Sequence, residues 1–269
     1  MYKLIAIDMD GTLLKKDKSI SKLNEAAIKK ASSLGVKIVL ATGRPLNGIK
    51  PYLNKLGLVT EQDYAVTYNG AVVQNTKTEQ VLSKQYLESE DLSQLYNLSQ
   101  TLKLNVHAFT PDCCITPKNN QYTQFEADVN SIPLEIVDFK KLRSDTEIVK
   151  LLMVEDPTVL SEAINLIPSE FYKKYTIVQS APYFLEFLHK TINKGTAVKL
   201  LAEKLNIKSE EIICIGDAGN DIHMVEYAGL GVAMGNAFPE VKAIADYVTL
   251  SNEDDGVAHV INKFVLNNF

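Results

Sequence analysis

Two aspartates, Asp8 and Asp10, stand directly after a short apolar run of Ile, Leu and Ala, and Gly11 and Thr12 follow them. A run of this length and composition is typical of a strand that is buried on both faces of a parallel sheet. The carboxyl ends of such strands are the places where open α/β sheets bind ligands. Two ionised carboxylates at that edge are costly without a partner, so the pattern indicates a bound cation.

The types and the spacing of these residues suit the transfer of a phosphoryl group. Asp8 can be the nucleophile because a carboxylate is ionised at neutral pH and needs no activating base. Asp10 can give a proton to the leaving alcohol and afterwards activate the water that hydrolyses the acyl phosphate. Gly11 permits the tight turn between them, and Thr12 can hold this turn by a hydrogen bond. Because phosphate monoesters hydrolyse so slowly, such a site has to lower the barrier by about 20 kcal/mol or more.

A second acidic loop, Gly216 to Asp221, follows a predicted strand at 211–215. A dianionic phosphate approaches several carboxylates only when their charge is compensated. This requirement indicates Mg²⁺, a hard ion that prefers oxygen ligands. We expect Asp8 and Asp217 to bind the ion directly and to be screened by it from the substrate.

Three further residues can bind the oxygens of a phosphate. Lys194 supplies a positive charge, and Thr42 supplies a hydroxyl beside the backbone amides around Gly43. Taken alone, a Thr-Gly pair is more often a turn or a helix cap, and a single lysine is more often a surface residue. Their place at the ends of predicted strands and helices makes the functional interpretation preferable.

The elements that must position these groups alternate between strand and helix patterns. Residues 21–34 are predicted to form a helix that buries Leu23 and Ile28 on one face, and residues 36–40 and 64–67 are predicted to be strands. This is the βαβ order of a parallel sheet.

The same rhythm returns near the end of the chain, with a predicted helix at 194–205 and predicted strands at 211–215, 231–234 and 246–249. If one sheet forms, polar residues from distant parts of the sequence meet at the carboxyl ends of its strands. These residues are Asp8, Thr42, Asn69 and Asp217.

We therefore predict an α/β fold with a Rossmann-like, doubly wound parallel sheet as its core, formed by residues 1–82 and 190–269. Residues 83–189 have a more irregular texture and are predicted to be an inserted α/β cap domain. The cap is expected to close over the site and to select the substrate. Its predicted helices lie at 90–104 and 158–167, and its predicted strands at 148–154, 175–179 and 184–188. His107 and Glu186 lie in this region, where a structural role and a contact with substrate both remain open.

Several motifs resemble those of the haloacid dehalogenase (HAD) superfamily of phosphatases, in particular its Cof-type class IIB branch of sugar-phosphatase-like hydrolases. They are Asp8-Met9-Asp10-Gly11-Thr12, Ala41-Thr42-Gly43-Arg44, Asn193-Lys194-Gly195 and Gly216-Asp217-Ala218-Gly219-Asn220-Asp221, which together cover both ends of the chain. The resemblance implies that Asp8 is the nucleophile, Asp10 the general acid and base, and Asp221 the residue that holds water bound to the metal. It implies that Mg²⁺ is held by Asp8, Asp217 and the backbone of Asp10. The phosphate is expected to contact Met9, Thr42, Gly43, Lys194 and Asn220.

Composition narrows the classes of partner. The chain has 269 residues, 46% of them hydrophobic and 23% charged, which are ordinary values for a soluble globular protein. A net charge of -5 argues against a general nucleic-acid binder. No apolar run reaches the length of a membrane span, no signal peptide is apparent, and three cysteines form no disulfide or zinc pattern. We expect a cytoplasmic monomer or weak homodimer that acts on a small phosphate ester.

Alternatives to hydrolysis stay open at the level of sequence. A phosphomutase that returns the phosphoryl group to another hydroxyl of the same sugar would use the same pair, Asp8 and Asp10. A non-catalytic protein that binds a phosphorylated metabolite is a further possibility, although every part of a working site is present. A dinucleotide-binding role is disfavoured, because Asp-x-Asp-Gly stands where a pyrophosphate loop needs glycines. Sugar phosphates, phosphorylated cofactors such as flavin mononucleotide or pyridoxal phosphate, and small sugar-acid phosphates are all compatible substrates.

Overall fold

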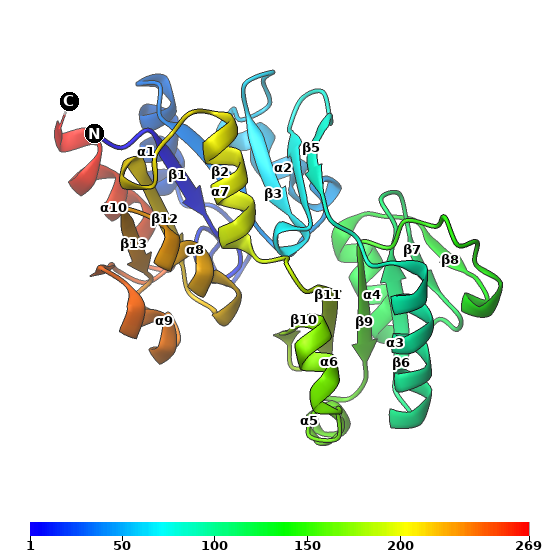
Figure 1. Ribbon diagram of the computed structural model, residues 1–269. Helices are drawn as coiled ribbons and strands as arrows, with labels where there is room; N and C mark the ends of the chain where they lie inside the picture. Colours follow the sequence, from blue (N-terminus) through cyan, green and yellow to red (C-terminus); the bar gives the residue numbers. More distant parts are fainter. Residues whose placement is uncertain (269) are drawn as a thin grey trace. The chain divides into compact units, whose positions relative to one another are not determined.

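A computed structural model describes residues 1–268 of the chain. The chain forms two compact units: a core unit, which comprises Met1–Lys84 and the described residues from Asn193 onward, and a cap unit, Gln85–Ile192 (Figure 1). These boundaries lie two and three residues beyond the predicted ones at 82 and 189. The first boundary moves because β5 (Val81–Lys84) pairs with β4 (Val72–Asn75) and so completes the sheet of the core unit.

The core unit contains an eight-stranded sheet in the order β14-β13-β12-β1-β2-β3-β4-β5. The six strands from β14 to β3 are parallel, and β4 is antiparallel to both of its neighbours, β3 and β5. The predicted α/β class with a parallel sheet is therefore confirmed. Besides β4 and β5, the strands are β1 (Leu4–Ile7), β2 (Lys37–Ala41), β3 (Tyr64–Thr67), β12 (Ile212–Gly216), β13 (Leu230–Ala233) and β14 (Tyr247–Val248).

Helices cover both faces of this sheet, as expected for a doubly wound fold (Figure 1). Side chains alternate along each strand, so Ile5 and Ile7 pack into one apolar cluster while Leu4 and Ala6 pack into another on the opposite face. The first cluster includes side chains of α1, α2, α9 and α10, and the second includes side chains of α7. The helices are α1 (Lys22–Ser33), α2 (Leu46–Leu56), α7 (Lys194–Lys204), α8 (Ile222–Tyr227), α9 (Pro239–Ile244) and α10 (Gly256–Phe264).

Helix α1 begins as predicted and buries Ile28 as expected, but Leu23 does not face the core. Ser21 caps it by accepting a hydrogen bond from the backbone of Asn24. Leu23, which was expected in the core, is 62% exposed, and the expectation was wrong. Asn24 is buried instead, because its side chain accepts a hydrogen bond from the backbone N–H of Ala258 at the start of α10. This polar contact sets which stripe of the helix faces inward.

The cap unit contains a six-stranded sheet in the order β10-β11-β9-β6-β7-β8. Only its last pair, β7 with β8, is parallel. One face packs against α3 and α5 in an apolar cluster that includes Leu95 and Leu160. The strands are β6 (Asn105–Phe109), β7 (Cys114–Thr116), β8 (Leu134–Ile136), β9 (Lys150–Val154), β10 (Tyr175–Ala181) and β11 (Phe184–His189), and the helices are α3 (Ser89–Leu102), α4 (Gln121–Asn130), α5 (Pro157–Ile164) and α6 (Ser169–Lys174).

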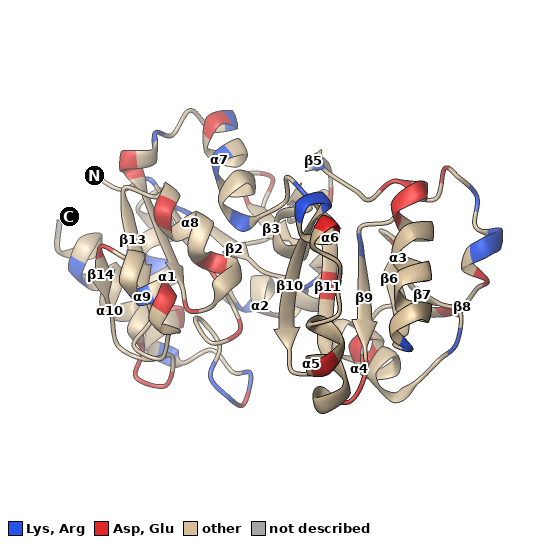
Figure 2. Cartoon of the chain, turned by 60° about the horizontal axis from the view of Figure 1, so that its bottom comes forward, with Lys and Arg blue, Asp and Glu red and all other residues tan. Residues whose placement is uncertain are grey.

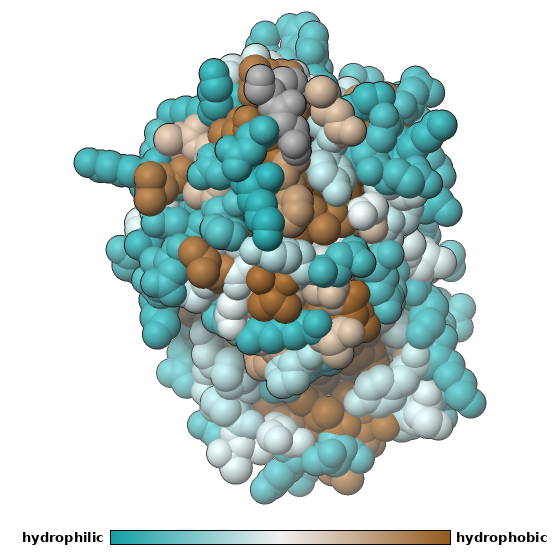
Figure 3. Space-filling view, turned by 90° about the vertical axis from the view of Figure 1, so that its left-hand side faces the viewer, coloured by the Kyte–Doolittle hydropathy of each residue, from teal (hydrophilic) through white to brown (hydrophobic). Residues whose placement is uncertain are grey.

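Charged residues of both signs are interspersed along both units (Figure 2). Figure 3 shows one face of the molecule, on which apolar residues are scattered among hydrophilic ones. Among residues 1–268, no helix combines the length and the apolar character that crossing a membrane requires.

Candidate active site

Asp8 lies at the carboxyl end of β1, between the ends of its two parallel neighbours, β12 and β2. Its backbone N–H donates to the carbonyl of Ile215, which continues the pairing with β12 by one residue. The residue is only 5% exposed. Oδ1 accepts a hydrogen bond of 2.6 Å from Lys194 Nζ, whereas Oδ2 is buried and has no partner among the described residues. One oxygen of this carboxylate is therefore left for a ligand.

The turn after Asp8 holds the second acidic residue, Asp217, in place. Thr12 Oγ1 donates a hydrogen bond of 2.8 Å to Asp217 Oδ1. Gly11 has a φ of 91°, and a side chain there would collide with the carboxylate of Asp217. The glycine is therefore required both by the backbone conformation and by the close approach of this acid.

One carboxylate oxygen of Asp221 is occupied by hydrogen bonds from the backbone. Its Oδ2 accepts hydrogen bonds from the N–H groups of Asp217 and Ala218, at 2.9 and 3.0 Å. This closes the loop after β12 into a short 3-10 turn, Gly219–Asp221. Its Oδ1 accepts from Lys194 Nζ at 2.7 Å. Asp221 is therefore fully buried and joins the loop to the lysine.

Lys194 connects these acids. It is the first residue of α7, whose start is capped by Asn193. The side chain has no exposed surface and forms ion pairs with both Asp8 and Asp221. Burial alone would lower the pKa of Lys194, but the two carboxylates outweigh it and raise that pKa above its ordinary value. The lysine therefore stays charged.

One ammonium group does not balance the three carboxylates. Oxygens of Asp8, Asp217 and Asp221 lie within 4.8 Å of one another. Burial, followed by repulsion from Asp221, raises the pKa of Asp8 well above its ordinary value. Burial also raises the pKa of Asp217, to about 6. Both shifts are those expected of a site that lacks positive charge.

These residues fit a hard divalent cation such as Mg²⁺. All the side-chain donors are carboxylate oxygens, the ligand type that Mg²⁺ prefers. Asp8 Oδ2 is a buried oxygen without a hydrogen bond in the described chain, and Asp217 lies beside it. Asp8 and Asp217 would hold the ion, and Asp221 is better placed to fix the loop than to bind it.

Asp10 does not join this cluster through its carboxylate. Arg44 binds it with two hydrogen bonds, Nε to Oδ2 at 2.8 Å and one terminal nitrogen to Oδ1 at 2.6 Å. Lys18 Nζ donates to Oδ1 at 2.7 Å. Partial burial acts to raise the pKa of Asp10, but the bonds and charge of Arg44 and Lys18 prevail and lower it. In this arrangement Asp10 is an ionised acceptor.

The remaining predicted phosphate contacts lie around the ends of β2 and β3. Thr42 Oγ1 accepts a hydrogen bond from the backbone of Arg44, and the carbonyl of Thr42 accepts from the N–H of Asn69. Asn220 Nδ2 donates to Asn69 Oδ1 at 3.0 Å, which links this edge to the loop after β12. A side chain at Gly43 would lie 3.2 Å from the Asn69 amide, so the space there is already narrow.

The conformation of Asn69 is unusual. Tyr68 and Asn69 both have positive φ, at 51° and 57°, in a short turn that ends at Gly70. Such values are costly for residues other than glycine and cluster at functional sites. Here they aim the Asn69 side chain at Asn220.

The structure thus brings Asp8, Asp217 and Lys194 together and connects Thr42 with Asn220 through Asn69. The side chain of Met9 is fully buried in the core, so only its backbone could meet a phosphate. The partners of Asp10, Arg44 and Lys18, were not predicted. The resemblance contained Arg44, whereas no pattern in the sequence singled out Lys18.

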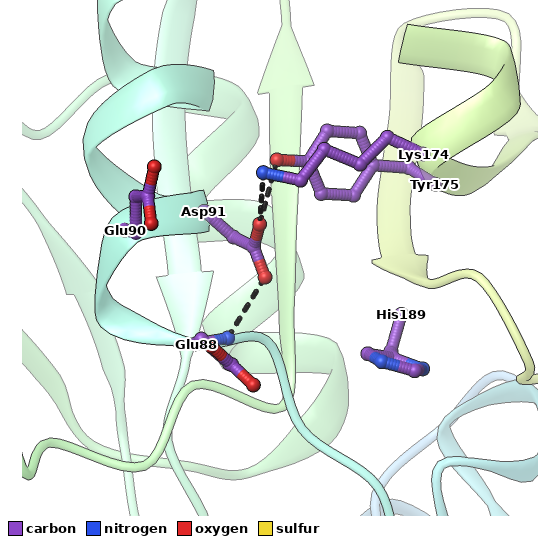
Figure 4. Close-up of a pocket in the computed structure, with 6 residues that line it drawn as sticks. All are labelled: Glu88, Glu90, Asp91, Lys174, Tyr175 and His189. Atoms are coloured by element: carbon purple, nitrogen blue, oxygen red, sulfur yellow. Dashed lines mark hydrogen bonds and ion pairs between the residues drawn. The ribbon is translucent and has the colours of Figure 1, made fainter.

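The cap unit has a pocket of its own, with a volume of about 310 Å³ (Figure 4). Asp91 accepts hydrogen bonds from the Tyr175 hydroxyl at 2.8 Å and from the Glu88 backbone, and it forms an ion pair with Lys174. Burial acts to raise the pKa of Asp91, but the hydrogen bond from Lys174 outweighs it and lowers that pKa. These contacts fasten the start of α3 to the junction of α6 and β10, which is a structural role. The lining residues are Glu88, Glu90, Asp91, Lys174, Tyr175 and His189.

Comparison with known proteins agrees with this geometry. A family model described as haloacid dehalogenase-like hydrolase matches residues 5–261. The chain belongs to this family. YxeH of Bacillus subtilis (strain 168), which is named as a candidate phosphatase, is 46% identical over 268 residues, and the match covers 99% of each chain. YcsE of the same organism, named as a 5-amino-6-(5-phospho-D-ribitylamino)uracil phosphatase, is 34% identical over 264 residues, which cover 98% of this chain and 96% of YcsE.

Solved structures of haloacid dehalogenase-like hydrolases have the same fold. One from Bacteroides thetaiotaomicron is 34% identical, with a TM-score of 0.86 and coverage of 98% of this chain and 99% of that one. The HAD subclass IIB sugar phosphatase BT4131 is 26% identical, with a TM-score of 0.82 and coverage of 97% and 98%. The predicted membership of the haloacid dehalogenase superfamily is confirmed.

Proposed function

We propose that this haloacid dehalogenase-like hydrolase is a Mg²⁺-dependent phosphatase that forms an aspartyl-phosphate on Asp8. The observation that carries the proposal is the set of contacts around the Asp8 carboxylate. One oxygen is held by the fully buried Lys194, the other has no partner among the described residues, and Asp217 lies beside it. Such an arrangement suits a nucleophile that receives phosphorus while a cation and a lysine compensate its charge.

In the first step, an Asp8 oxygen bonds to phosphorus while the bond from phosphorus to the ester oxygen breaks. The leaving oxygen takes a proton from Asp10, which becomes ionised. In the second step, ionised Asp10 takes a proton from water, whose oxygen attacks phosphorus, and the bond to Asp8 breaks. To carry a proton in the first step, Asp10 has to leave Arg44 and Lys18, because their bonds favour its ionised form. Bound Mg²⁺ would neutralise phosphate oxygens and lower the repulsion between substrate and nucleophile.

The proposed substrates are small phosphate monoesters. YcsE is named for a phosphorylated ribitylaminouracil and BT4131 is described as a sugar phosphatase, so a leaving group of this size suits relatives with the same fold. We further propose that the cap unit selects the leaving group, since the residues that would hold the phosphate lie in the core unit.

Hydrolysis of p-nitrophenyl phosphate tests the proposed activity. We expect Mg²⁺-dependent release of nitrophenol that is abolished by a chelator and by Asp8→Asn. Asp145→Asn, in which a surface ion pair is removed, serves as the matched control and should keep wild-type activity. Activity that survives both the chelator and Asp8→Asn would refute the proposal. Measuring orthophosphate with a hexose phosphate as substrate separates hydrolysis from the mutase reaction, which yields an isomer.

A further inference from the structure

The turn that carries Asp10 away from β1 is held from two sides. The N–H groups of the three residues after Gly11 donate to the carbonyls of the two residues before Asp10, which closes the turn from within. The carbonyls of Gly11 and Leu14 accept hydrogen bonds from other parts of the core unit. Glycine has the freest backbone of all residues, and Gly11 directly adjoins Asp10. The direction in which the acid points therefore depends on what holds this glycine.

Two asparagine side chains from the other end of the sequence donate these outer bonds. Asn236, in the loop after β13, donates through Nδ2 to the carbonyl of Gly11 at 2.8 Å. Asn252, in the loop after β14, donates through Nδ2 to the carbonyl of Leu14 at 2.8 Å. The two asparagines are also joined to each other, because the backbone N–H of Asn252 donates to Asn236 Oδ1 at 2.9 Å. Both loops thus take part in holding the turn.

The loop of Asn236 is itself fixed to the second acidic loop. The backbone N–H of Phe238 donates to the carbonyl of Asp217 at 2.9 Å. A single short segment therefore contacts the residue proposed to hold the cation and the glycine beside Asp10. Through Asn236, the position of the Asp10 turn is set relative to Asp217.

The two asparagines differ in burial. Asn252 is only 7% exposed, so its bonds belong to the packing of the core unit. Asn236 is exposed, and a hydrogen bond at such a place contributes little to stability because water competes for the same groups. Asparagine combines a donor and an acceptor in one side chain, and Asn236 uses both. Control over the position of Gly11 explains these two bonds better than stability does.

We propose that Asn236 is a positioning residue for Asp10: its bond to the Gly11 carbonyl sets the direction in which the turn presents the acid. The inference rests on the proposed function, in which Asp10 gives its proton to the ester oxygen while the bond from phosphorus to that oxygen breaks. A catalytic group that is displaced by about 1 Å can cost on the order of a hundredfold in rate. One bond at the base of the turn is therefore enough to affect the proton transfer.

Two aryl esters of similar size test this role in the full-length protein. p-Nitrophenolate is a stabilised anion that leaves with little protonation, whereas the phenolate of phenyl phosphate needs the proton of an acid. The kinetic constant kcat/KM covers the steps up to the departure of this group. In Asn236→Ala, kcat/KM should fall about tenfold for phenyl phosphate and change little for p-nitrophenyl phosphate, so the ratio between the two esters rises. Asp10→Asn should raise the same ratio further.

Two more variants separate the donated bond from other effects. Asn236→Asp keeps an acceptor for the N–H of Asn252 but, when ionised, has no hydrogen to give to Gly11, so it should raise the ratio as well. Asn54→Ala removes an exposed asparagine side chain from the last turn of α2 and serves as the matched control. It should leave the ratio at the wild-type value.

The outcomes distinguish this inference from the proposed function. A wild-type ratio in either Asn236 variant would overturn the inference, and so would an equal loss with both esters, which indicates a general structural effect. Loss of folding in Asn236→Ala, measured by circular dichroism, would also overturn it. If Asp10→Asn leaves the ratio unchanged, or the wild-type protein hydrolyses neither ester with Mg²⁺, the proposed function itself fails, and the role of Asn236 with it.

Discussion

Replacing Lys194 with methionine should strongly destabilise the core unit, because the substitution leaves buried carboxylates without their positively charged partner. The ammonium group has no exposed surface and lies 2.6 Å from Asp8 and 2.7 Å from Asp221. Breaking a buried ion pair by removing one partner typically costs about 3–5 kcal/mol. We therefore expect a loss of roughly this size in the free energy of unfolding at pH 7 in the presence of a chelator.

Added Mg²⁺ should restore part of that loss. If all three carboxylates are ionised, the cluster carries a charge of -2 with Lys194 and -3 without it. The variant should therefore gain more stability from Mg²⁺ than the wild-type protein does, although its phosphatase activity stays low. The two effects are measured by urea unfolding, followed by circular dichroism, with chelator and with Mg²⁺.

Lys77→Met is the matched control. Lys77 pairs with Glu61 at the surface, where their side chains are 52% and 72% exposed, and such a pair contributes about 0–1 kcal/mol. The reasoning is refuted if Lys194→Met costs no more than Lys77→Met in chelator, or if Mg²⁺ stabilises the variant no more than the wild-type protein.

Three other substitutions test separate parts of the site and the cap. Arg44→Ala should shift the pH profile of kcat for p-nitrophenyl phosphate to higher pH, because Asp10 loses the two bonds that help to keep its pKa low, and an unchanged profile would contradict this role. Gly11→Ala should abolish most activity by displacing Asp217, whereas Gly35→Ala, with a similar φ of 89° but open space, should cost only about 1 kcal/mol of stability and no activity. The pKa of His107 lies at about 3, below the ordinary 6.5, so between these values the unfolded chain binds one more proton than the native one. Stability should therefore fall as the pH drops through this window, by at most about 1.4 kcal/mol per unit, and His107→Gln but not the exposed His223→Gln should reduce that slope in urea titrations.

The catalytic part of the fold was accessible from sequence because its signals are local. Apolar runs that end in acids mark buried parallel strands: β1 ends directly before Asp8, and β12 lies within a residue of its expected bounds. The convergence of Asp8 and Asp217 then followed from the rule that ligands bind at the carboxyl ends of such strands. That rule concerns backbone direction, so it holds without knowledge of packing.

Features that depend on tertiary contacts were not predicted. Asn24 is buried and Leu23 is exposed, because the Asn24 side chain accepts a hydrogen bond from α10, which lies far along the chain. The pairing of Asp10 with Lys18 needs the turn between them to fold back, and a lysine eight residues away gives no local signal. In the cap unit, β6 carries the polar His107 and so lacks the uniform apolar pattern that marks a buried strand, whereas β9 lies within the strand predicted at 148–154.

The central claim is that phosphorus is transferred to the carboxylate of Asp8 with the help of a cation. A crystal structure of the protein with Mg²⁺ and beryllium fluoride, which mimics a phosphoryl group, tests it most directly. We predict beryllium bonded to an Asp8 oxygen, with the magnesium ion held between Asp8 and Asp217. An unmodified Asp8 with no cation at Asp217 would contradict the proposed chemistry.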